Sequence, residues 1–319
     1  MTRLRSALFL LGIISVTPAV GAQPTPLKAH GALVHSVAVS PDGKTLATAG
    51  FDNVVKLWDL APDGALKEKK ALTGHTGPVY AVAFHPTDAK LVATASQDKT
   101  ARIWDVTDGK TKFELKGHTD IVDAIAFSPD GKSLATAGAD KSVRLWNPAD
   151  GKEVKNLGAH DGSVYVVAFS PDGKTLASAG AGKDNLIKLW SVKDLKELKQ
   201  LKGHEQPVTS IAFTGDDKVL VSASMDRTIR VWNVVDAKET KKLGPTTDDP
   251  YALAWSEKAK TAAVCGYSGL ITVWALDADK PKFTKAIKNP GYCVAFAADG
   301  TFVVTGHDNG TVAVTPIGK

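Results

Sequence analysis

Residues 74–105, GHTGPVYAVAFHPTDAKLVATASQDKTARIWD, decide the fold, because close copies of this stretch recur from the thirties to the C-terminus. Apolar residues alternate with others in three short runs, the period-two pattern of half-buried strands, at residues 79–84, 91–95 and 101–104. The turn after the first run occurs elsewhere as Ser-Pro-Asp-Gly, where Pro and Gly suit the required backbone angles. A second turn is centred on Asp98. The stretch therefore predicts a small antiparallel sheet.

An alignment on the Asp of the second turn and the Trp of the last strand shows seven consecutive copies of the repeat. Five keep both residues at one spacing, which predicts hairpins of matched length: Asp52/Trp58, Asp98/Trp104, Asp140/Trp146, Asp184/Trp190 and Asp226/Trp232. The sixth has Ser268 with Trp274, and the seventh has Asp308 with Val314. A tandem period of just over forty residues indicates one repeat architecture rather than several separate domains.

Two dipeptides mark the ends of the repeat. Gly-His opens it at residues 74–75, 117–118 and 203–204, and Trp-Asp closes it at residues 58–59 and 104–105. With this period, the sequence resembles the WD40 family of β-propellers over essentially all of the chain after residue 22. The resemblance implies an all-β, seven-bladed propeller of four-stranded antiparallel blades. It also implies closure by the N-terminal strand, in which Pro24 to Lys28 would pair with Thr311 to Thr315.

The first 22 residues differ from the rest of the chain. Arg3 and Arg5 precede an apolar run at residues 7–16, and small residues follow up to Ala22, which predicts a secretory signal peptide. The run is too short to span a bilayer as a helix. We therefore expect a signal peptide at residues 1–22 and one propeller domain at residues 23–319. The mature chain is expected to be periplasmic or extracellular, of bacterial type, monomeric and without a transmembrane segment.

A histidine lies four residues ahead of a strand-opening valine in each of the first five repeats. Five histidines could suggest metal or acid–base chemistry, but the resemblance implies a structural tetrad of His, a strand hydroxyl, the turn Asp and the Trp indole. The expected tetrads are His30, Thr48, Asp52 and Trp58; His75, Thr94, Asp98 and Trp104; His118, Thr136, Asp140 and Trp146; His160, Ser178, Asp184 and Trp190; and His204, Ser222, Asp226 and Trp232. Repeats six and seven lack the hydroxyl, with Val264 and Val304 in its place, and are expected to be less rigid.

Both cysteines of the chain, Cys265 and Cys293, fall in these two weakened repeats. One interpretation is an inter-blade disulfide, which an oxidising compartment would permit. The other, which we favour, is two buried free thiols, because a disulfide needs Cα atoms within about 7 Å of each other.

Lysine-rich segments lie between the repeats, at residues 67–70, 110–116, 193–202, 238–242 and 280–288. We expect them on the outermost strands, where lysine opposes edge-to-edge association. An alternative is that this rim binds an anionic surface. Acidic residues such as Glu68 and Glu114 interrupt the runs, and the formal net charge is only +5, which weakens that alternative.

The resemblance also implies a docking face, to which each blade contributes two positions. The first, five residues after the His position, gives His35, Tyr80, Asp123, Tyr165, Thr209, Tyr251 and Tyr292. The second, just before the turn Asp, gives Phe51, Gln97, Ala139, Lys183, Met225, Tyr267 and His307. All five tyrosines of the chain fall in these two series. Tyrosine combines a large apolar body with a polar tip, which suits an interface.

The sequence contains no nucleophile motif, phosphate-binding loop or clustered Cys/His set. His35, His307 and Asp123 could meet near the channel mouth, but they do not form a spaced metal motif. We therefore expect a binding protein for a protein or peptide partner, not an enzyme, with no cofactor, no metal and no nucleic acid. The alternative is a propeller enzyme with a site at the channel mouth, which the fold alone does not exclude.

Overall fold

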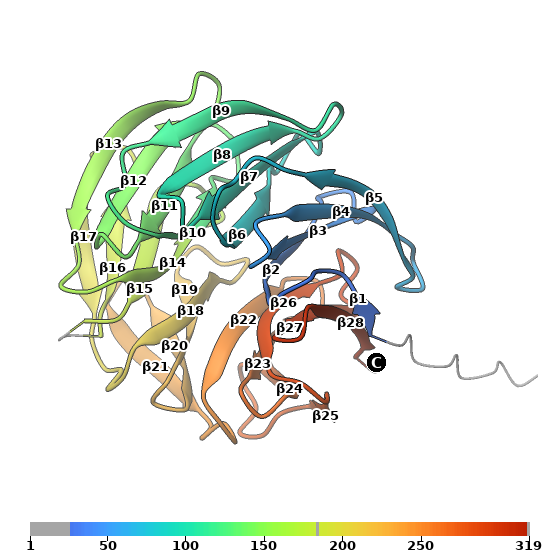
Figure 1. Cartoon of the computed structure of the whole chain (residues 1–319). Coiled ribbons are helices and arrows are strands. Elements are labelled where there is room, and N and C mark those ends of the chain that lie inside the picture. The colour runs from blue at the N-terminus through green and yellow to red at the C-terminus, as the bar shows by residue number, and fades with distance from the viewer. Residues whose placement is uncertain (1–25, 183–184, 318–319) are drawn as a thin grey trace, which may run out of the picture.

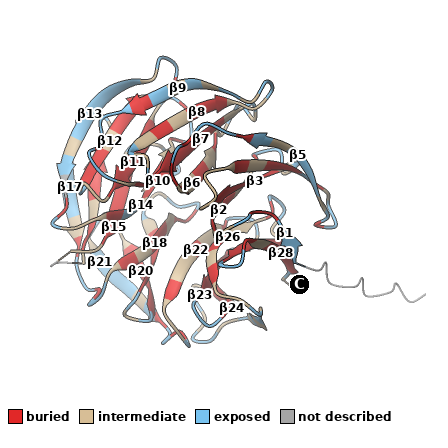
Figure 2. Cartoon of the chain, in the orientation of Figure 1, coloured by how far each residue is buried: buried red, intermediate tan, exposed pale blue. Residues whose placement is uncertain are grey.

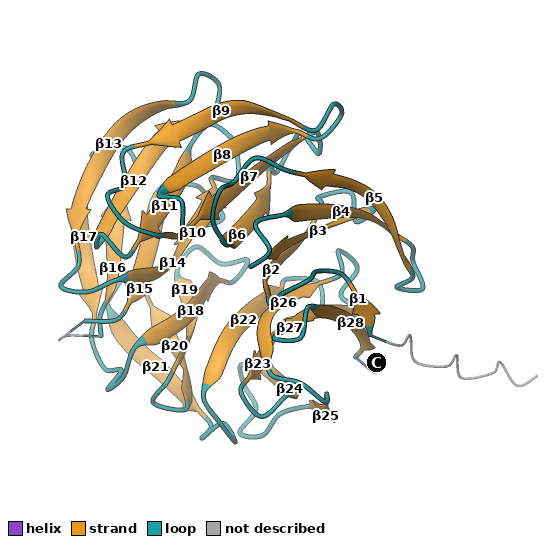
Figure 3. Cartoon of the chain, viewed as in Figure 1, coloured by secondary structure: helices purple, strands orange, loops and turns teal. Residues whose placement is uncertain are grey.

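Seven four-stranded antiparallel sheets stand around a central channel as the blades of a propeller (Figure 1). The computed structural model describes residues 26–182 and 185–317. The predicted signal peptide, with Lys183 and Asp184, lies outside these ranges. Figure 3 shows strands joined by loops and turns, with no helix in the part of the chain that is described. The all-β, seven-bladed prediction is thus confirmed.

Six blades are built from four consecutive strands, numbered from the channel outward. They are β2 (Val34–Val39), β3 (Thr45–Gly50), β4 (Val55–Leu60) and β5 (Leu66–Leu72); β6 (Val79–Phe84), β7 (Leu91–Ser96), β8 (Thr100–Asp105) and β9 (Lys110–Lys116); β10 (Val122–Phe127), β11 (Leu134–Gly138), β12 (Ser142–Asn147) and β13 (Lys152–Ala159); β14 (Val164–Phe169), β15 (Thr175–Gly180), β16 (Ile187–Ser191) and β17 (Lys196–Leu201); β18 (Val208–Phe213), β19 (Val219–Ser224), β20 (Thr228–Asn233) and β21 (Lys238–Leu243); and β22 (Pro250–Ser256), β23 (Thr261–Gly266), β24 (Leu270–Ala275) and β25 (Phe283–Ala286).

The seventh blade joins the two ends of the chain. It consists of β26 (Gly291–Phe296), β27 (Phe302–His307), β28 (Thr311–Pro316) and the two-residue β1 (Leu27–Lys28). Leu27 pairs with Val312, and Lys28 pairs with Thr311. The first residues of the predicted closing strand lie outside the described ranges, so closure by the N-terminal strand as a whole stays a prediction.

The hydrophobic core consists of seven clusters, most of them spanning two adjacent blades. One contains Ala47, Val55 and Leu57 from the first blade with Val79 and Trp104 from the second. Another joins the first blade to the last, and β2 lies beside β26. Figure 2 shows second strands such as β11 and β15 largely buried and outer strands such as β5 and β13 largely exposed. Burial on both faces of the second strands therefore requires a neighbouring blade on each side.

A chain of buried hydrogen bonds crosses each of the first five blades. In the second blade, His75 Nδ1 lies 2.7 Å from Asp98 Oδ2, and His75 Nε2 lies 2.7 Å from Thr94 Oγ1. The Trp104 indole donates to the same hydroxyl at 2.8 Å. Equivalent four-residue networks join His30, Thr48, Asp52 and Trp58; His118, Thr136, Asp140 and Trp146; and His204, Ser222, Asp226 and Trp232. His160, Ser178 and Trp190 are joined in the same way.

Each of these five blades also pairs a cation with a glutamate of its outermost strand. The cation lies two residues before the Trp, on the third strand, so that its long side chain reaches outward. The pairs are Lys56–Glu68 at 3.0 Å, Arg102–Glu114 at 3.3 Å, Arg144–Glu153 at 2.6 Å, Lys188–Glu197 at 3.3 Å and Arg230–Glu239 at 2.6 Å. The glutamates that interrupt the lysine-rich segments thus have structural partners. Those segments overlap β5, β9, β17, β21 and β25, all outermost strands.

Blades six and seven replace the network with other contacts. The Trp274 indole donates to Thr272 on its own strand at 2.9 Å, since Val264 offers no hydroxyl. In the last blade, Thr305 Oγ1 lies 3.1 Å from His307 Nε2. Cys265 and Cys293 are buried free thiols, as favoured from the sequence. Cys265 donates to the Gly291 carbonyl at 3.4 Å, and Cys293 donates to the Val34 carbonyl at 3.6 Å, so both link neighbouring segments.

Asp98→Ala should destabilise the fold by about 2–4 kcal/mol, because it leaves His75 and several backbone donors without their acceptor. Burial alone would raise the pKa of Asp98, but hydrogen bonds from His75 and Thr100 outweigh it and hold this pKa below its usual range. The stabilisation is therefore present above about pH 4 and is lost progressively in acid. Chemical denaturation at pH 7 and pH 3 measures it.

Ser268→Ala, at the matching position of the sixth blade, is the control. Ser268 is exposed, and its backbone N–H, which the substitution keeps, donates to Asp248. We expect a change within about 0.5 kcal/mol. Equal unfolding midpoints for the two variants at pH 7 would contradict the role assigned to the buried network.

Candidate functional site

One residue from the innermost strand of each blade lines a cavity of about 230 Å³, here named the channel-mouth cavity. The seven lining residues are His35, Tyr80, Asp123, Tyr165, Thr209, Tyr251 and Tyr292. They are the complete first series expected from the sequence. The structure therefore brings together residues that are up to 257 positions apart, between His35 and Tyr292.

Each lining residue lies at a β-bulge. In the second blade, Val79 pairs with Ser96 and Ala81 pairs with Ala95, so Tyr80 is the extra residue between them. The same shift falls at the second residue of β2, β10, β14, β18, β22 and β26. A bulge bends the strand and redirects a side chain, and bulges are frequent near functional sites. This repeated irregularity explains why seven side chains converge on one cavity.

Aromatic rings form two groups around the cavity. His35 stacks on Phe51 with ring centroids 5.3 Å apart, and Tyr80 lies 4.8 Å from His35 and 4.9 Å from Phe51. His35 Nδ1 also contacts the Tyr80 carbonyl at 2.7 Å, and burial lowers the pKa of His35. The second group, Tyr251 stacked on Tyr292 with centroids 5.0 Å apart, adjoins the first, since the Tyr292 and His35 rings lie 6.5 Å apart. These contacts fix most of the aromatic lining before any ligand arrives.

Asp123 is the acidic residue of the lining. Its Oδ2 atom is buried and has no hydrogen-bond partner among the described residues. Burial raises the pKa of Asp123 to about 7, with further contributions from the charges of Asp120 and Asp140. Burial together with the charge of Asp123 also raises the pKa of Tyr80 and of Tyr165, its neighbours in the adjoining blades. The cavity therefore contains a carboxyl group that ionises near neutral pH.

The second predicted series is less uniform. Gln97, Met225 and Tyr267 are exposed, with Tyr267 the most open at 64%, while Phe51 and Ala139 are half-buried. Lys183 lies outside the described residues. His307 differs, because it is only 2% exposed and its Nδ1 lies 3.2 Å from the Pro290 carbonyl. The structure thus corrects the expectation that His307 is open to a partner.

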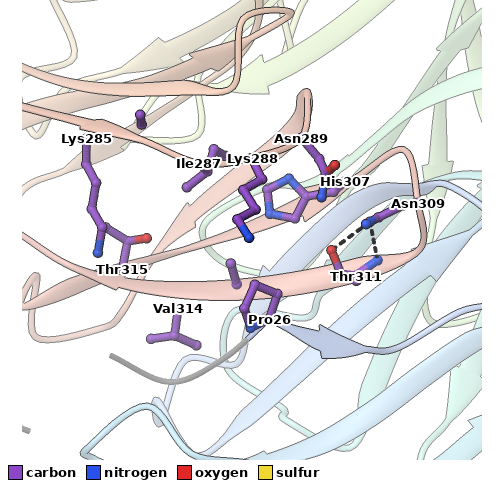
Figure 4. A pocket seen from close by; sticks show the side chains of 12 residues that line it. Pro26, Lys285, Ile287, Lys288, Asn289, His307, Asn309, Thr311, Val314 and Thr315 are labelled. Carbon is purple, nitrogen blue, oxygen red and sulfur yellow. Dashed lines mark hydrogen bonds between the residues drawn. The ribbon is translucent and has the colours of Figure 1, made fainter. Parts of the chain in front are cut away.

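His307 instead helps to line a separate pocket of about 410 Å³ between the sixth and seventh blades, shown in Figure 4 with Pro26, Lys285, Lys288, Asn309 and Val314. Some polar groups there already have partners, since Thr311 donates from its hydroxyl to Asn309 at 2.7 Å. His307 lines this pocket, while His35 and Asp123 line the channel-mouth cavity. The sequence allowed these three side chains to meet, but the structure separates them.

Across residues 26–182 and 185–317, no group of three or more His, Cys, Asp or Glu side chains is arranged to hold a metal ion. No helix in the same ranges is both long and apolar enough to cross a membrane. The chemistry that the channel-mouth cavity does offer is aromatic contact, one carboxylate and the Tyr and Thr hydroxyls.

The unusual state of Asp123 was not predicted from the sequence. The residue was expected in the first series, but not with a buried oxygen that lacks a partner. A signal was present, because Asp123 is the only acidic member of either series and Asp120 and Asp140 lie close to it in the sequence. The five cation–glutamate pairs were also missed, although each cation lies two residues before a Trp.

Comparisons with known proteins agree with the architecture. Residues 79–252 match the model for the echinoderm microtubule-associated protein second beta-propeller. Residues 21–59 and 287–314 match the WD domain, G-beta repeat. The first of these matches covers more than half of the chain.

Similar individual proteins match over shorter stretches. Coronin-7 of Bos taurus is 40% identical over 112 residues, which are 33% of this chain and 12% of coronin-7, and human coronin-7 is 36% identical over the same length. Protein transport protein SEC13 homolog B of Arabidopsis thaliana is 40% identical over 58 residues, 18% of this chain and 19% of that protein. The chain thus matches less than a fifth of the length of each of these relatives.

Asp123→Asn should stabilise the fold at pH 8 by about 1–3 kcal/mol, allowing for solvent screening. The folded pKa of about 7 lies above the unfolded value, so the folded protein loses stability as the pH rises from about 4 to 7. The amide variant has no such loss, and the two proteins should converge near pH 4. Urea unfolding across this range measures the difference.

Thr209→Val is the matched control, because it alters the same cavity without changing an ionisable group. Thr209 donates to the Pro250 carbonyl at 2.8 Å, so we expect a destabilisation that does not vary with pH. A constant difference between Asp123→Asn and the parent protein over the same range would contradict a carboxyl that ionises near pH 7.

Proposed function

Because the chain belongs to the WD40-repeat family of β-propellers, we propose that it is an exported interaction scaffold that binds a protein or peptide on the face carrying the channel-mouth cavity. In this proposal the propeller acts by binding and has no catalytic activity. The chain's own match to the WD domain, G-beta repeat, and its similarity to a relative that is a protein transport protein by name support a scaffold in general terms.

The observation that carries the proposal is the distribution of tyrosine. All five tyrosines of the chain fall in the two series, four of them in the cavity lining and the fifth at position 267. Tyr165 and Tyr267 are 39% and 64% exposed, unusual for large aromatic side chains. Exposed aromatic residues around a concave site are typical anchors of protein interfaces.

Two other functions compete with this one. A catalytic site at the channel mouth would need a nucleophile or an acid–base pair aligned on a substrate, and among the described residues no donor contacts Asp123 Oδ2 to form such a pair. Binding of an anionic surface by the lysine-rich rim is disfavoured by the rim's own acidic groups, since Lys69 lies 3.2 Å from Asp59 and Lys241 lies 3.2 Å from Asp279. Surface pairs of this kind reduce the positive field.

The proposal includes export and ring closure. We propose that residues 1–22 are removed as a signal peptide and that the new N-terminus at Gln23 leads into the strand that closes the last blade. The charge and apolar pattern of residues 1–22 and the pairing of Leu27 with Val312 support this. N-terminal sequencing of the native chain tests the cleavage site.

Tyr165→Ala and Tyr251→Ala should each weaken a captured partner by about 1–2 kcal/mol or more and leave the fold intact. Tyr165 is exposed and contributes little to the core, so its loss should act through the interface. The measurement is affinity capture from the native compartment, followed by titration of the identified partner against each variant.

Lys69→Glu and Lys112→Glu on the outermost strands are the controls and should bind as the parent does. The opposite result would be that the rim variants lose a salt-sensitive interaction while the tyrosine variants keep it. That result would show that the partner binds the lysine-rich rim and not the proposed docking face.

A chain that starts at Gln23 should unfold cooperatively, whereas one that starts at His30 should lose cooperativity or aggregate. The shorter chain lacks Leu27 and Lys28, which pair with β28, and exposes that strand as an edge. Calorimetry compares the two, and equal melting temperatures would show that the N-terminal strand is not needed for closure.

A further inference from the structure

The channel-mouth cavity has the features of a site for a cation. Its lining joins tyrosine rings to one carboxyl group, and Asp123 Oδ2 is buried there without a hydrogen-bond donor among the described residues. A buried acceptor that lacks a donor costs about 1–3 kcal/mol, and more when it is charged. A group that brings both a donor and a positive charge would remove this cost.

The aromatic rings favour the same kind of ligand. A ring presents a negative face, and a cation held over it gains about 0.5–2 kcal/mol, more when water is excluded. Tyr80 and Tyr165 line the cavity from the two blades that flank the blade of Asp123, and its charge acts on both. The carboxylate and the ring faces thus attract the same charge from two sides.

The size of the cavity indicates what carries the cation. Its volume of about 230 Å³ is below the roughly 300–1,000 Å³ of sites that enclose drug-sized ligands. A single side chain of four carbons with a terminal ammonium fits this scale. An ammonium also suits a single free oxygen, whereas a guanidinium is best matched by two acceptors in a fork.

We propose that the channel-mouth cavity receives the ammonium group of a lysine side chain inserted by the partner, and that Asp123 is its counter-ion. This inference rests on the function proposed above, because it assumes that the partner docks on this face.

The test uses n-butylammonium, which is the lysine side chain without its backbone. The neutral analogue is n-butanol, and n-propylguanidinium represents the arginine side chain with its forked donors. NMR titrations at pH 8 measure binding through the ring signals of protein that carries isotope-labelled tyrosine. We expect saturable shifts at Tyr80 and Tyr165 with n-butylammonium and at least fivefold weaker binding of both analogues. Tighter binding of n-propylguanidinium would overturn the assignment to lysine.

Asp123→Asn should weaken n-butylammonium at least tenfold and leave n-butanol unchanged. The amide keeps the size of the side chain, and the variant is expected to fold. Binding should also weaken as the pH falls below 7, because protonation removes the counter-ion, and Asp120, Asp140, Tyr80 and Tyr165 are the other ionisable groups that interact with it. An unchanged n-butylammonium affinity in Asp123→Asn would overturn the proposal.

Tyr165→Leu provides a second variant, since it keeps an apolar side chain and removes the ring. It should weaken n-butylammonium more than n-butanol. If n-butylammonium does not bind while Tyr165→Ala still loses a captured partner, the cation site is refuted and the docking face stands. If n-butylammonium binds and no tyrosine variant affects the partner, the site exists but the proposed docking face fails.

Discussion

In each of the first five blades, the buried hydrogen-bond network is centred on a hydroxyl group of the second strand, and the structure of the repeat depends on this group. In the second blade, Thr94 accepts from the Trp104 indole and contacts His75, which in turn contacts Asp98 in the next turn. These groups are buried, so each must find a partner inside the protein. The network ties the loop before a blade to its second and third strands. It therefore holds the loop and the turn in register with the sheet.

The same register sets the bulge that forms the site. The strand-opening residue of each innermost strand pairs across the sheet, and the following residue is left out of the ladder. Since the opening residue is fixed by core packing, as Val79 is at 0% exposure, the next side chain is directed toward the channel mouth. Core packing of the strand-opening residue thus determines where the next residue lies, without determining which amino acid it is. This separation lets one scaffold carry different binding surfaces.

Much of the fold could be predicted, because it follows from the spacing of the repeat in the sequence. The strand at residues 79–84 needed only the alternation of apolar residues. The seven-residue lining also needed the resemblance to the WD40 family, which implied a docking position five residues after each His position. What could not be predicted depends on contacts between blades. The burial of His307 against the Pro290 carbonyl arises because its own blade lacks the tetrad histidine, and no spacing rule encodes that replacement. The contacts of the two thiols with carbonyl groups of neighbouring blades likewise depend on inter-blade distances that the sequence does not set.

Asp123 shows why binding groups are the hardest to recognise from pattern alone. The sequence gives its position, yet its buried oxygen and its pKa of about 7 arise from neighbours in three dimensions. A carboxyl in such a place lowers the stability of the fold at neutral pH, while an amide of the same size would not. Proteins keep destabilising groups where function needs them, and a strained or unpaired group is therefore a better indicator of function than a well-satisfied one. By that criterion the tetrad histidines, such as His75 with both ring nitrogens engaged, belong to the scaffold, and Asp123 belongs to the candidate site.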